Sequence, residues 1–174
     1  MNRFISISGA FALGLVAVPA HPSPASPALI TGALGAAPAA VARGATVISG
    51  DGKVLRKGGN GWTCMPDNPA TPGPDPMCFD KVGLAWAMAW MGHKTPPGAT
   101  GMAYMLKGGT DASNLDPFAT KPTRGWIKTG PHVMILSADA ARASGYPAGA
   151  NPDTSKPYVM FAGTPYAHIM MPTK

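Results

Sequence analysis

Two stretches of sequence, residues 129–138 (TGPHVMILSA) and residues 165–174 (PYAHIMMPTK), share one pattern. Each places a histidine inside an otherwise apolar run and a methionine two positions later. Short apolar runs that are bounded by glycine or proline are typical of buried β-strands. The two stretches therefore predict strands in the core of a sheet. The histidine and methionine side chains on these strands are the candidates for binding a ligand.

Each histidine shares a face of its strand with the methionine that follows it, because side chains alternate between the two faces. If strand 132–136 lies beside strand 166–171, two imidazoles and two thioethers could converge. This hypothesis gives a metal site with four ligands: His132, Met134, His168 and Met170. Thioether and imidazole ligands together suit Cu(I), so copper is the cofactor that such a site would hold.

A structural interpretation of the same residues competes with the metal site, and we favour it on the sequence alone. Methionine fills irregular gaps in a core, and a histidine in a strand is more often hydrogen bonded than bound to a metal. The remaining methionines are scattered, without the clustered Met-x-x-Met runs of dedicated copper carriers. Haem is a weaker alternative cofactor, because the sequence has no Cys-x-x-Cys-His attachment motif.

The second stretch predicts one arm of a β-hairpin. Two apolar runs, 158–162 and 166–171, flank a turn at Gly163–Thr164. A symmetrical hairpin about this turn places Val159 opposite His168. Both faces of this hairpin are apolar, so we expect a helix or a loop to cover each of them.

A buried helix is predicted at residues 81–91 (KVGLAWAMAWM). Asp80 precedes it as an N-cap, and Gly92 follows its last turn. Trp86 and Trp90 lie four residues apart and therefore share a face of the helix. Because the sequence of this helix is mostly apolar, we expect the sheet and its loops to cover it.

The remaining signals predict a hairpin around Asp51–Gly52, a strand at 102–106 and a short helix that begins after Ser137. The strands are mostly sequential along the chain. The fold class that we predict is therefore α+β, an antiparallel sheet of about five or six strands with one buried helix and one short helix.

The first 45 residues predict two segments outside the folded domain. Residues 1–20 combine an early arginine, a short apolar run and small residues up to Ala20, which is the pattern of a signal peptide. Residues 21–45 are rich in proline and alanine and predict a disordered spacer. Residues 46–174 then form a single compact α+β domain. We expect an exported protein, periplasmic or extracellular, with no transmembrane segment in the mature chain.

The chain has two cysteines, Cys64 and Cys78. An even number of cysteines in an exported chain points to a disulfide. Their spacing matches no zinc motif, and the sequence between them is rich in Pro, Gly, Asp and Asn. We therefore predict one disulfide, Cys64–Cys78, which closes a loop with little structure of its own.

The charge pattern argues against nucleic acid as a partner. The formal net charge is +6, but the lysines and arginines are spread singly along the chain. No run of basic residues and no mixture of basic and aromatic residues forms a binding motif. The positive charge therefore predicts an ordinary solvated surface.

Catalysis has little support in the sequence. Gly-x-Ser-x-Gly, His-Glu-x-x-His and P-loop motifs are absent, and the chain contains no glutamate. A nucleophile, base and acid could be drawn from Ser113, His132 and Asp116, but most chains of this size offer such a triple. A non-enzyme is the favoured class, and a small hydrolase built on the same histidines is the second alternative.

The loop 107–125 is polar and broken by prolines, and loops of this length often carry function. We expect a pocket between this loop and the two strands that carry histidine. Its predicted residues are Tyr104, Asp111, Asn114, Asp116 and Tyr166. The leading hypothesis is a binding or structural module for a small ligand or a component of the cell envelope. A copper-binding protein is the first alternative.

Long motifs cover most of residues 51–173: WTCMPDNP…DPMCFD, AYMLKGG…SNLDPFAT, W-x-x-TGPHVMI and KPYVMFAGTPYAHIMMP. In these motifs the chain resembles an uncharacterised group of small secreted bacterial proteins. The resemblance implies export and a single compact domain. It implies no activity, no cofactor and no catalytic residue.

Overall fold

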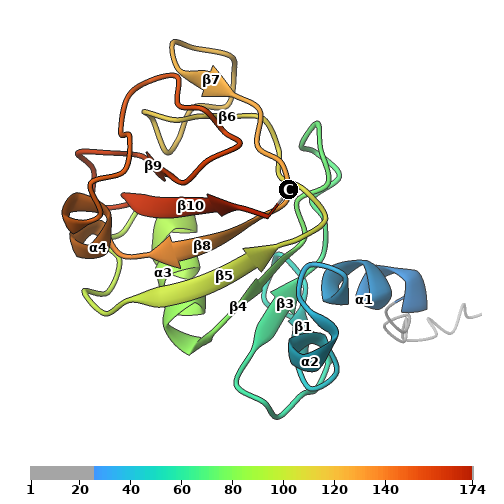
Figure 1. The fold of residues 1–174 in the computed structure, drawn as a ribbon. Helices are drawn as coiled ribbons and strands as arrows, with labels where there is room; N and C mark the ends of the chain where they lie inside the picture. Colours follow the sequence, from blue (N-terminus) through green and yellow to red (C-terminus); the bar gives the residue numbers. More distant parts are fainter. Residues whose placement is uncertain (1–25, 174) are drawn as a thin grey trace, which may run out of the picture.

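The computed structural model describes residues 26–173, and Figure 1 shows a large sheet with helices packed against it. The helices are α1 (Pro27–Leu34), α2 (Ala39–Ala42), α3 (Lys81–Met91) and α4 (Ala138–Ala143). The strands of the large sheet are β1 (Thr46–Ile48), β2 (Val54–Arg56), β3 (Thr63–Met65), β4 (Met77–Phe79), β5 (Gly101–Met105), β8 (His132–Leu136), β9 (Tyr158–Met160) and β10 (His168–Pro172). A separate pair consists of β6 (Ala112–Ser113) and β7 (Trp126–Ile127). None of the described helices is long and apolar enough to cross a membrane.

The eight strands of the large sheet lie in the order β2-β1-β3-β4-β5-β8-β10-β9. Neighbouring strands are antiparallel except β1 and β3, which are parallel. The predicted α+β class is confirmed. The prediction of five or six strands, all antiparallel, with two helices is wrong in the number of elements and in the direction of β3.

The parallel pair arises because the chain leaves β2 and crosses the start of β1 before it forms β3. At this crossing Gly59 N–H donates to Gly44 O (2.9 Å) and Gly58 N–H donates to Thr46 Oγ1 (3.1 Å). A Cβ atom on Gly58 would clash with the backbone of Ala45, so glycine is needed where the two segments cross. The glycines indicate a turn in the sequence, but they do not indicate on which side of β1 the chain returns.

Residues 26–45 are folded, so the predicted disordered spacer is wrong for this segment. α1 contacts β1, β3 and β4, and α2 follows beside the same part of the sheet (Figure 1). Ala33 and Ala36 are fully buried in a cluster with Val47 and the two cysteines. Alanine is a strong helix former, and its short side chain lets the helix approach the sheet closely. The predicted signal peptide, residues 1–20, lies outside the described residues.

The predicted disulfide Cys64–Cys78 is confirmed. The two cysteines lie opposite each other on β3 and β4, and both are fully buried. They belong to the cluster that α1 covers, and Cys78 Sγ lies 3.7 Å from Ala33 O. The disulfide therefore joins two adjacent strands beneath the N-terminal helices, as well as closing the loop between them.

The other face of the sheet carries α3, and the helix predicted at residues 81–91 is confirmed. Its predicted burial is only partly correct, because Met88 and Met91 are exposed. Asp80 caps this helix, because its side chain accepts a hydrogen bond from Gly83 N–H (2.6 Å). A Cβ atom on Gly101 of β5 would clash with the backbone of Gly83. Two glycines therefore let the first turn of α3 approach the backbone of the sheet directly.

The centre of the sheet is formed by β5, β8 and β10. Met105 of β5 pairs with His132 of β8, and Met134 of β8 pairs with Met170 of β10. Residues that lie directly opposite each other on antiparallel strands have side chains on the same face. The register therefore brings an imidazole and three thioethers to the face that α3 covers.

The predicted C-terminal hairpin is confirmed as β9–β10, but its predicted register is wrong by one residue. Met160, and not Val159, lies opposite His168. Phe161 has a positive φ of 57°, and its N–H donates to Asn114 O (2.9 Å), so it leaves the ladder of the hairpin. The turn is therefore wider than a symmetrical turn at Gly163–Thr164. As a result, Val159 packs on the opposite face, in the cluster that α4 covers.

We predict that Gly101→Ala lowers the free energy of unfolding by about 2–4 kcal/mol, because the new methyl group pushes α3 away from β5. Gly98→Ala is the matched control, since a Cβ atom there meets no atom within 4 Å. Urea unfolding of both variants measures the difference. Equal stability of the two variants would contradict a tight contact between α3 and β5.

Candidate functional site

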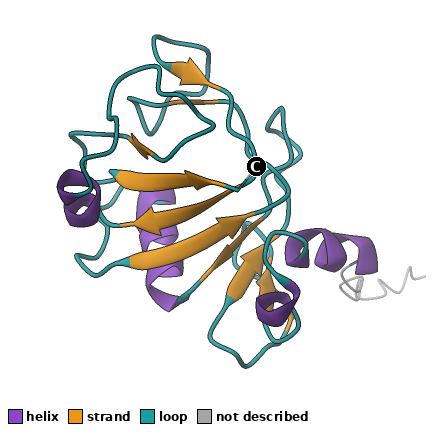
Figure 2. Cartoon of the chain, in the orientation of Figure 1, coloured by secondary structure: helices purple, strands orange, loops and turns teal. Residues whose placement is uncertain are grey.

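A cavity of about 660 Å³ lies between α3 and the sheet face that carries both histidines. Side chains of β5, β8 and β10 line one wall, and the second half of α3 lines another. Exposed residues of loops 68–72 and 116–122 also line the cavity, so it reaches solvent beside these loops. Figure 2 shows that long loops make up much of the chain outside the sheet.

The lining of the cavity is rich in soft and aromatic side chains. Seven of the eleven methionines of the chain contribute to it: Met65, Met77, Met91, Met105, Met134, Met160 and Met170. The aromatic side chains in the lining are Phe79, Trp86, Trp90, Trp126 and Phe161. Methionine is flexible and polarisable, so these walls can adapt to the shape of an apolar ligand. The methionines look scattered in the sequence, and only the sheet register brings them together.

His132 is buried at the wall of this cavity, with 3% of its surface exposed. Its Nδ1 lies 2.6 Å from Gly130 O. Because a carbonyl oxygen can only accept, Nδ1 carries the proton and Nε2 has a free lone pair. Burial lowers the pKa of His132, so the ring is neutral at pH 7. Nε2 has no hydrogen-bond partner among the described residues.

His168 has the same hydrogen bond but a more crowded setting. Its Nδ1 donates to Tyr166 O at 2.9 Å. The rings of Trp86 and Phe161 meet it edge-on, with centroids 5.3 Å and 5.4 Å away. Burial lowers the pKa of His168 to about 4, and the charge that His132 can carry adds to this shift. The aromatic contacts indicate a structural role for His168.

Four buried side-chain nitrogen or oxygen atoms in residues 26–173 lack a hydrogen-bond partner. Three of them belong to residues that line the cavity: Trp86 Nε1, Thr110 Oγ1 and His132 Nε2. Buried polar groups are nearly always paired, and an unpaired one costs about 1–3 kcal/mol. Three residues that line the cavity therefore carry a buried donor, acceptor or hydroxyl that no protein group among the described residues satisfies.

The register separates the two histidines of the predicted four-ligand metal site. β8 and β10 are neighbours as expected, and Met134 pairs with Met170. His132 lies two residues from this pair in one direction, and His168 lies two residues from it in the other. The two histidines are therefore offset by four residues along the strand direction, or about 13 Å. On flat strands this offset is too large for their imidazoles to bind one ion. Among residues 26–173, no three His, Cys, Asp or Glu side chains gather as a metal site, but the predicted site has only two such side chains and is of a different kind.

The predicted pocket residues divide into three groups. Asp111 and Asp116 line the cavity. Asn114 and Tyr166 support its walls: Asn114 Nδ2 donates to Val159 O (3.2 Å), and Tyr166 packs edge-on against Trp86. The prediction that Tyr104 lines the pocket is wrong, because this residue lies on the opposite face of β5. There it packs against Trp62 with ring centroids 5.2 Å apart. The small residues of β5 face α3, so the larger alternate residues face away from it.

The loop that borders the cavity is attached to α3 through contacts that the sequence did not suggest. Trp90 Nε1 donates to Pro117 O at 3.0 Å. Phe118 stacks on His93, with ring centroids 4.0 Å apart, and meets Tyr166 edge-on at 5.2 Å. These contacts join residues 25 or more positions apart in the chain, so no local pattern could have predicted them.

The charged groups of the cavity lining are all acidic. Asp75, Asp111 and Asp116 belong to it, and the lining has no lysine or arginine. Asp75 is buried, and its carboxylate accepts hydrogen bonds from Asn68 N–H (2.8 Å) and Thr71 Oγ (2.8 Å). Burial raises the pKa of Asp75. An anionic ligand would meet no countercharge here, whereas a neutral or cationic ligand is compatible with the lining.

The triple that a hydrolase would use is not assembled in residues 26–173. Ser113 Oγ accepts hydrogen bonds from Leu115 N–H (3.2 Å) and Asp116 N–H (3.0 Å), which makes it part of a turn. No hydrogen bond joins Ser113 to His132 within the described residues. A nucleophile needs a base within hydrogen-bond reach, so the geometry gives the hydrolase hypothesis no support.

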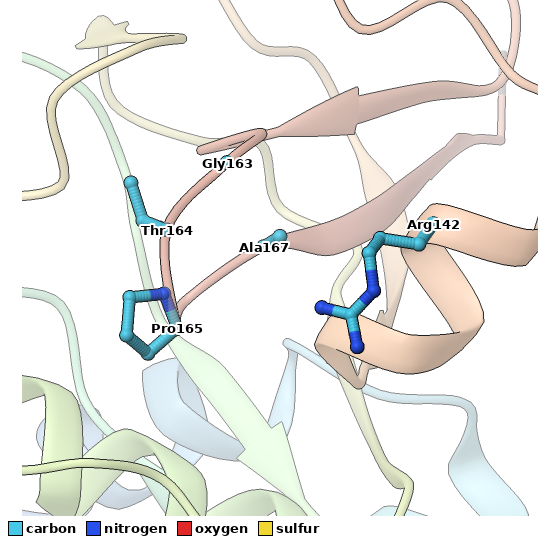
Figure 3. A pocket seen from close by; sticks show the side chains of 5 residues that line it. All are labelled: Arg142, Gly163, Thr164, Pro165 and Ala167. Carbon is cyan, nitrogen blue, oxygen red and sulfur yellow. The ribbon is translucent and has the colours of Figure 1, made fainter.

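A second hollow of about 380 Å³ lies beside α4, and Figure 3 shows the residues around it. Its lining is Arg142 and four residues of the turn before β10: Gly163, Thr164, Pro165 and Ala167. Arg142 is largely exposed and already pairs with Asp139 on its own helix. This hollow contains no buried polar side chain of the kind that would position a ligand.

Comparison with protein-family models, with curated proteins and with solved structures finds no match to this chain.

The depressed pKa of His168 predicts that the protein loses stability in mild acid. The unfolded chain binds the proton at a pKa near 6.5, and the folded chain binds it only near 4. At pH 7 both states are mostly neutral, so the difference has little effect there; it lowers the free energy of unfolding by about 3 kcal/mol as the pH falls from about 6.5 to about 4. Urea unfolding at pH 7, 5.5 and 4.5 measures this loss.

His168→Asn removes the titrating group while its amide can still donate to Tyr166 O, so we expect a flatter dependence of stability on pH. His93→Asn is the control, because His93 is exposed and asparagine tolerates its positive φ of 53°. If His168→Asn kept the full acid sensitivity of the wild-type protein, burial of His168 would not be its cause.

Proposed function

We propose that this protein is an exported binding module that holds a small, mostly apolar ligand in the cavity beneath α3. One observation carries the proposal: three residues that line a single, mostly apolar cavity of about 660 Å³ carry buried polar atoms without a protein partner. Ligand pockets in proteins typically combine these features, a volume of about 300–1,000 Å³, apolar walls and a few polar groups that fix orientation.

The apolar lining of the cavity favours an apolar occupant. The cavity reaches solvent beside loops 68–72 and 116–122, so water can enter it when no ligand is bound. Water against these mostly apolar walls has few polar partners. An apolar molecule that displaces such water gains free energy.

The polar atoms define which functional groups the ligand should carry. His132 Nε2 accepts a hydrogen bond, so the ligand needs a donor near this end of the cavity. Trp86 Nε1 donates, so an acceptor on the ligand would satisfy it. The three aspartates and the aromatic walls favour an uncharged or cationic ligand over an anion.

Export is part of the proposal, and two features support it. Residues 1–20 have the pattern of a signal peptide. The disulfide Cys64–Cys78 is typical of proteins in oxidising compartments. We therefore place the binding module in the periplasm or outside the cell.

The fluorescent amine N-phenyl-1-naphthylamine tests the proposal, because it is neutral and apolar and offers one N–H donor. We expect saturable binding of one dye per chain, with a rise in dye fluorescence and quenching of tryptophan, since Trp86, Trp90 and Trp126 line the cavity. Titration of the purified protein measures both signals.

Ala87→Leu fills part of the cavity and should weaken dye binding at least about tenfold. Ala85→Leu is the matched control, because the same change falls on the exposed side of the same helix. Ala112→Leu narrows the cavity from the loop side and replaces Ala87→Leu if that variant does not fold. Absence of dye binding by the folded wild-type protein, or equal binding by all variants, would contradict the proposal.

A further inference from the structure

A row of soft side chains crosses the sheet at the His132 end of the cavity. Met65 of β3 pairs with Met77 of β4, and Met105 of β5 pairs with His132 of β8. Cys78 of β4 pairs with Tyr104 of β5. In this antiparallel register, the neighbouring Met77 therefore lies opposite Met105. Three thioethers and one imidazole therefore form a continuous row, and all four residues line the cavity.

Two thioethers neighbour His132 on this face, while Pro172 of β10 lies opposite it on its other side. Met105 lies directly opposite, and Cβ atoms of such pairs are about 4.5–5.5 Å apart. Met134 lies two positions along β8 on the same face, about 7 Å away at the backbone. Methionine side chains are long and flexible, so both sulfur atoms can reach toward the imidazole.

The imidazole is already in the form that binds a metal. A ligating histidine normally donates its other N–H to a carbonyl or a carboxylate, which fixes the tautomer. His132 makes this bond through Nδ1 to Gly130 O and leaves Nε2 unpaired. Gly109 lies close to the other side of the ring, where a Cβ atom would approach His132 Cε1 to 3.1 Å, so the ring cannot turn freely.

We propose that His132 Nε2, Met105 Sδ and Met134 Sδ bind one Cu(I) ion at this end of the cavity. The inference rests on the proposed function, because the ion would occupy part of the same cavity. It replaces the four-ligand site predicted from the sequence with a smaller site that the register permits. His168 has no part in it, because aromatic rings surround that histidine.

The ligand set selects a soft, monovalent ion. Imidazole with two thioethers suits Cu(I), whereas Zn²⁺ prefers thiolate, several imidazoles or carboxylate. Both cysteines are consumed in the disulfide. The nearby acids Asp75 and Asp111 belong to the cavity lining and attract a cation through long-range electrostatics without having to bind it.

A competition titration with bicinchoninate, a chromogenic Cu(I) chelator, tests the site on the purified full chain under anaerobic conditions. We expect one Cu(I) per chain. Met105→Leu and Met134→Leu should each weaken binding at least about tenfold, because leucine keeps the volume but removes the sulfur ligand. His132→Gln should abolish binding. Met160→Leu is the matched control, since it makes the same change in the same cavity beside His168.

Binding of Ag(I), a redox-inert substitute for Cu(I), gives a direct readout of the ligands. With ¹³C-methyl methionine, the NMR signals of Met105 and Met134 should shift on addition of one equivalent of Ag(I). The signal of Met171, which is exposed on the opposite face of β10, should stay in place. Shifts confined to other methionines would overturn the assignment.

The outcomes separate this inference from the proposed function. Dye binding without Cu(I) binding overturns the metal site and leaves the organic ligand. Cu(I) binding that depends on Met105 and Met134, without dye binding, supports the metal site and overturns the organic ligand. Failure of both probes with the folded wild-type protein overturns both. Equal loss of Cu(I) affinity in Met105→Leu, Met134→Leu and Met160→Leu overturns the specific site.

Discussion

The close contact between Gly83 and Gly101 is the constraint on which the functional face of this protein depends. Because neither residue has a side chain, the first turn of α3 lies directly against β5. The second half of the same helix carries Trp86 and Trp90, whose rings need more space than glycine. The helix therefore touches the sheet at one end, and the cavity lies beneath its other end, where these tryptophans form part of the lining. The same contact decides which residues of β5 face the helix: Gly101 and Ala103 face α3, and Tyr104 faces away from it.

The two histidines show how equal local geometry can give different chemistry. Both rings donate Nδ1–H to the carbonyl two residues earlier, and burial lowers both pKa values, so both are neutral at pH 7 with the same tautomer. His168 then packs between aromatic rings, whereas His132, with its Nε2 unpaired, lies opposite Met105 on the cavity wall. The two His-x-Met runs are equivalent in the sequence, but the residues that lie opposite the two histidines on neighbouring strands differ. Register, which is a property of the whole sheet, decides which histidine is available to a ligand.

Much of the local structure could be predicted from the sequence, because its signals are local. Asp80 and Gly92 bound the helix 81–91, and strand 132–136 appears as a short apolar run between Pro131 and Ser137. The disulfide followed from the number of cysteines. The sequence does not distinguish the helices of residues 26–45 from a disordered spacer, because alanine and proline are common in both. Their burial depends on a matching sheet surface, which is far away in sequence.

The candidate site was only partly predictable for the same physical reason. The sequence indicated that His132 and Met134 share a face and that the loop 107–125 borders a pocket, since both follow from alternation and loop length. It could not indicate that Met65, Met77 and Met105 continue the row, because this requires the pairing of four strands. A one-residue error in the last hairpin was enough to exchange Val159 for Met160 beside His168. Ligand sets on a sheet face are therefore less predictable than the strands that carry them.

The volume of the cavity also bears on how the two proposals relate. A Cu(I) ion with its three ligands would use little of the roughly 660 Å³, and it would satisfy His132 but not Trp86 or Thr110. An organic ligand that reaches Trp86 need not displace an ion at the His132 end, and a polar group on it could complete the coordination of that ion. The structure is therefore compatible with a metal held at one end of the cavity and an apolar molecule in the remainder. A ligand group that donates to His132 Nε2 would compete with the ion, whereas a group that completes its coordination would raise the affinity for it. In either case the two affinities would change by the same factor, because coupling between two sites is reciprocal.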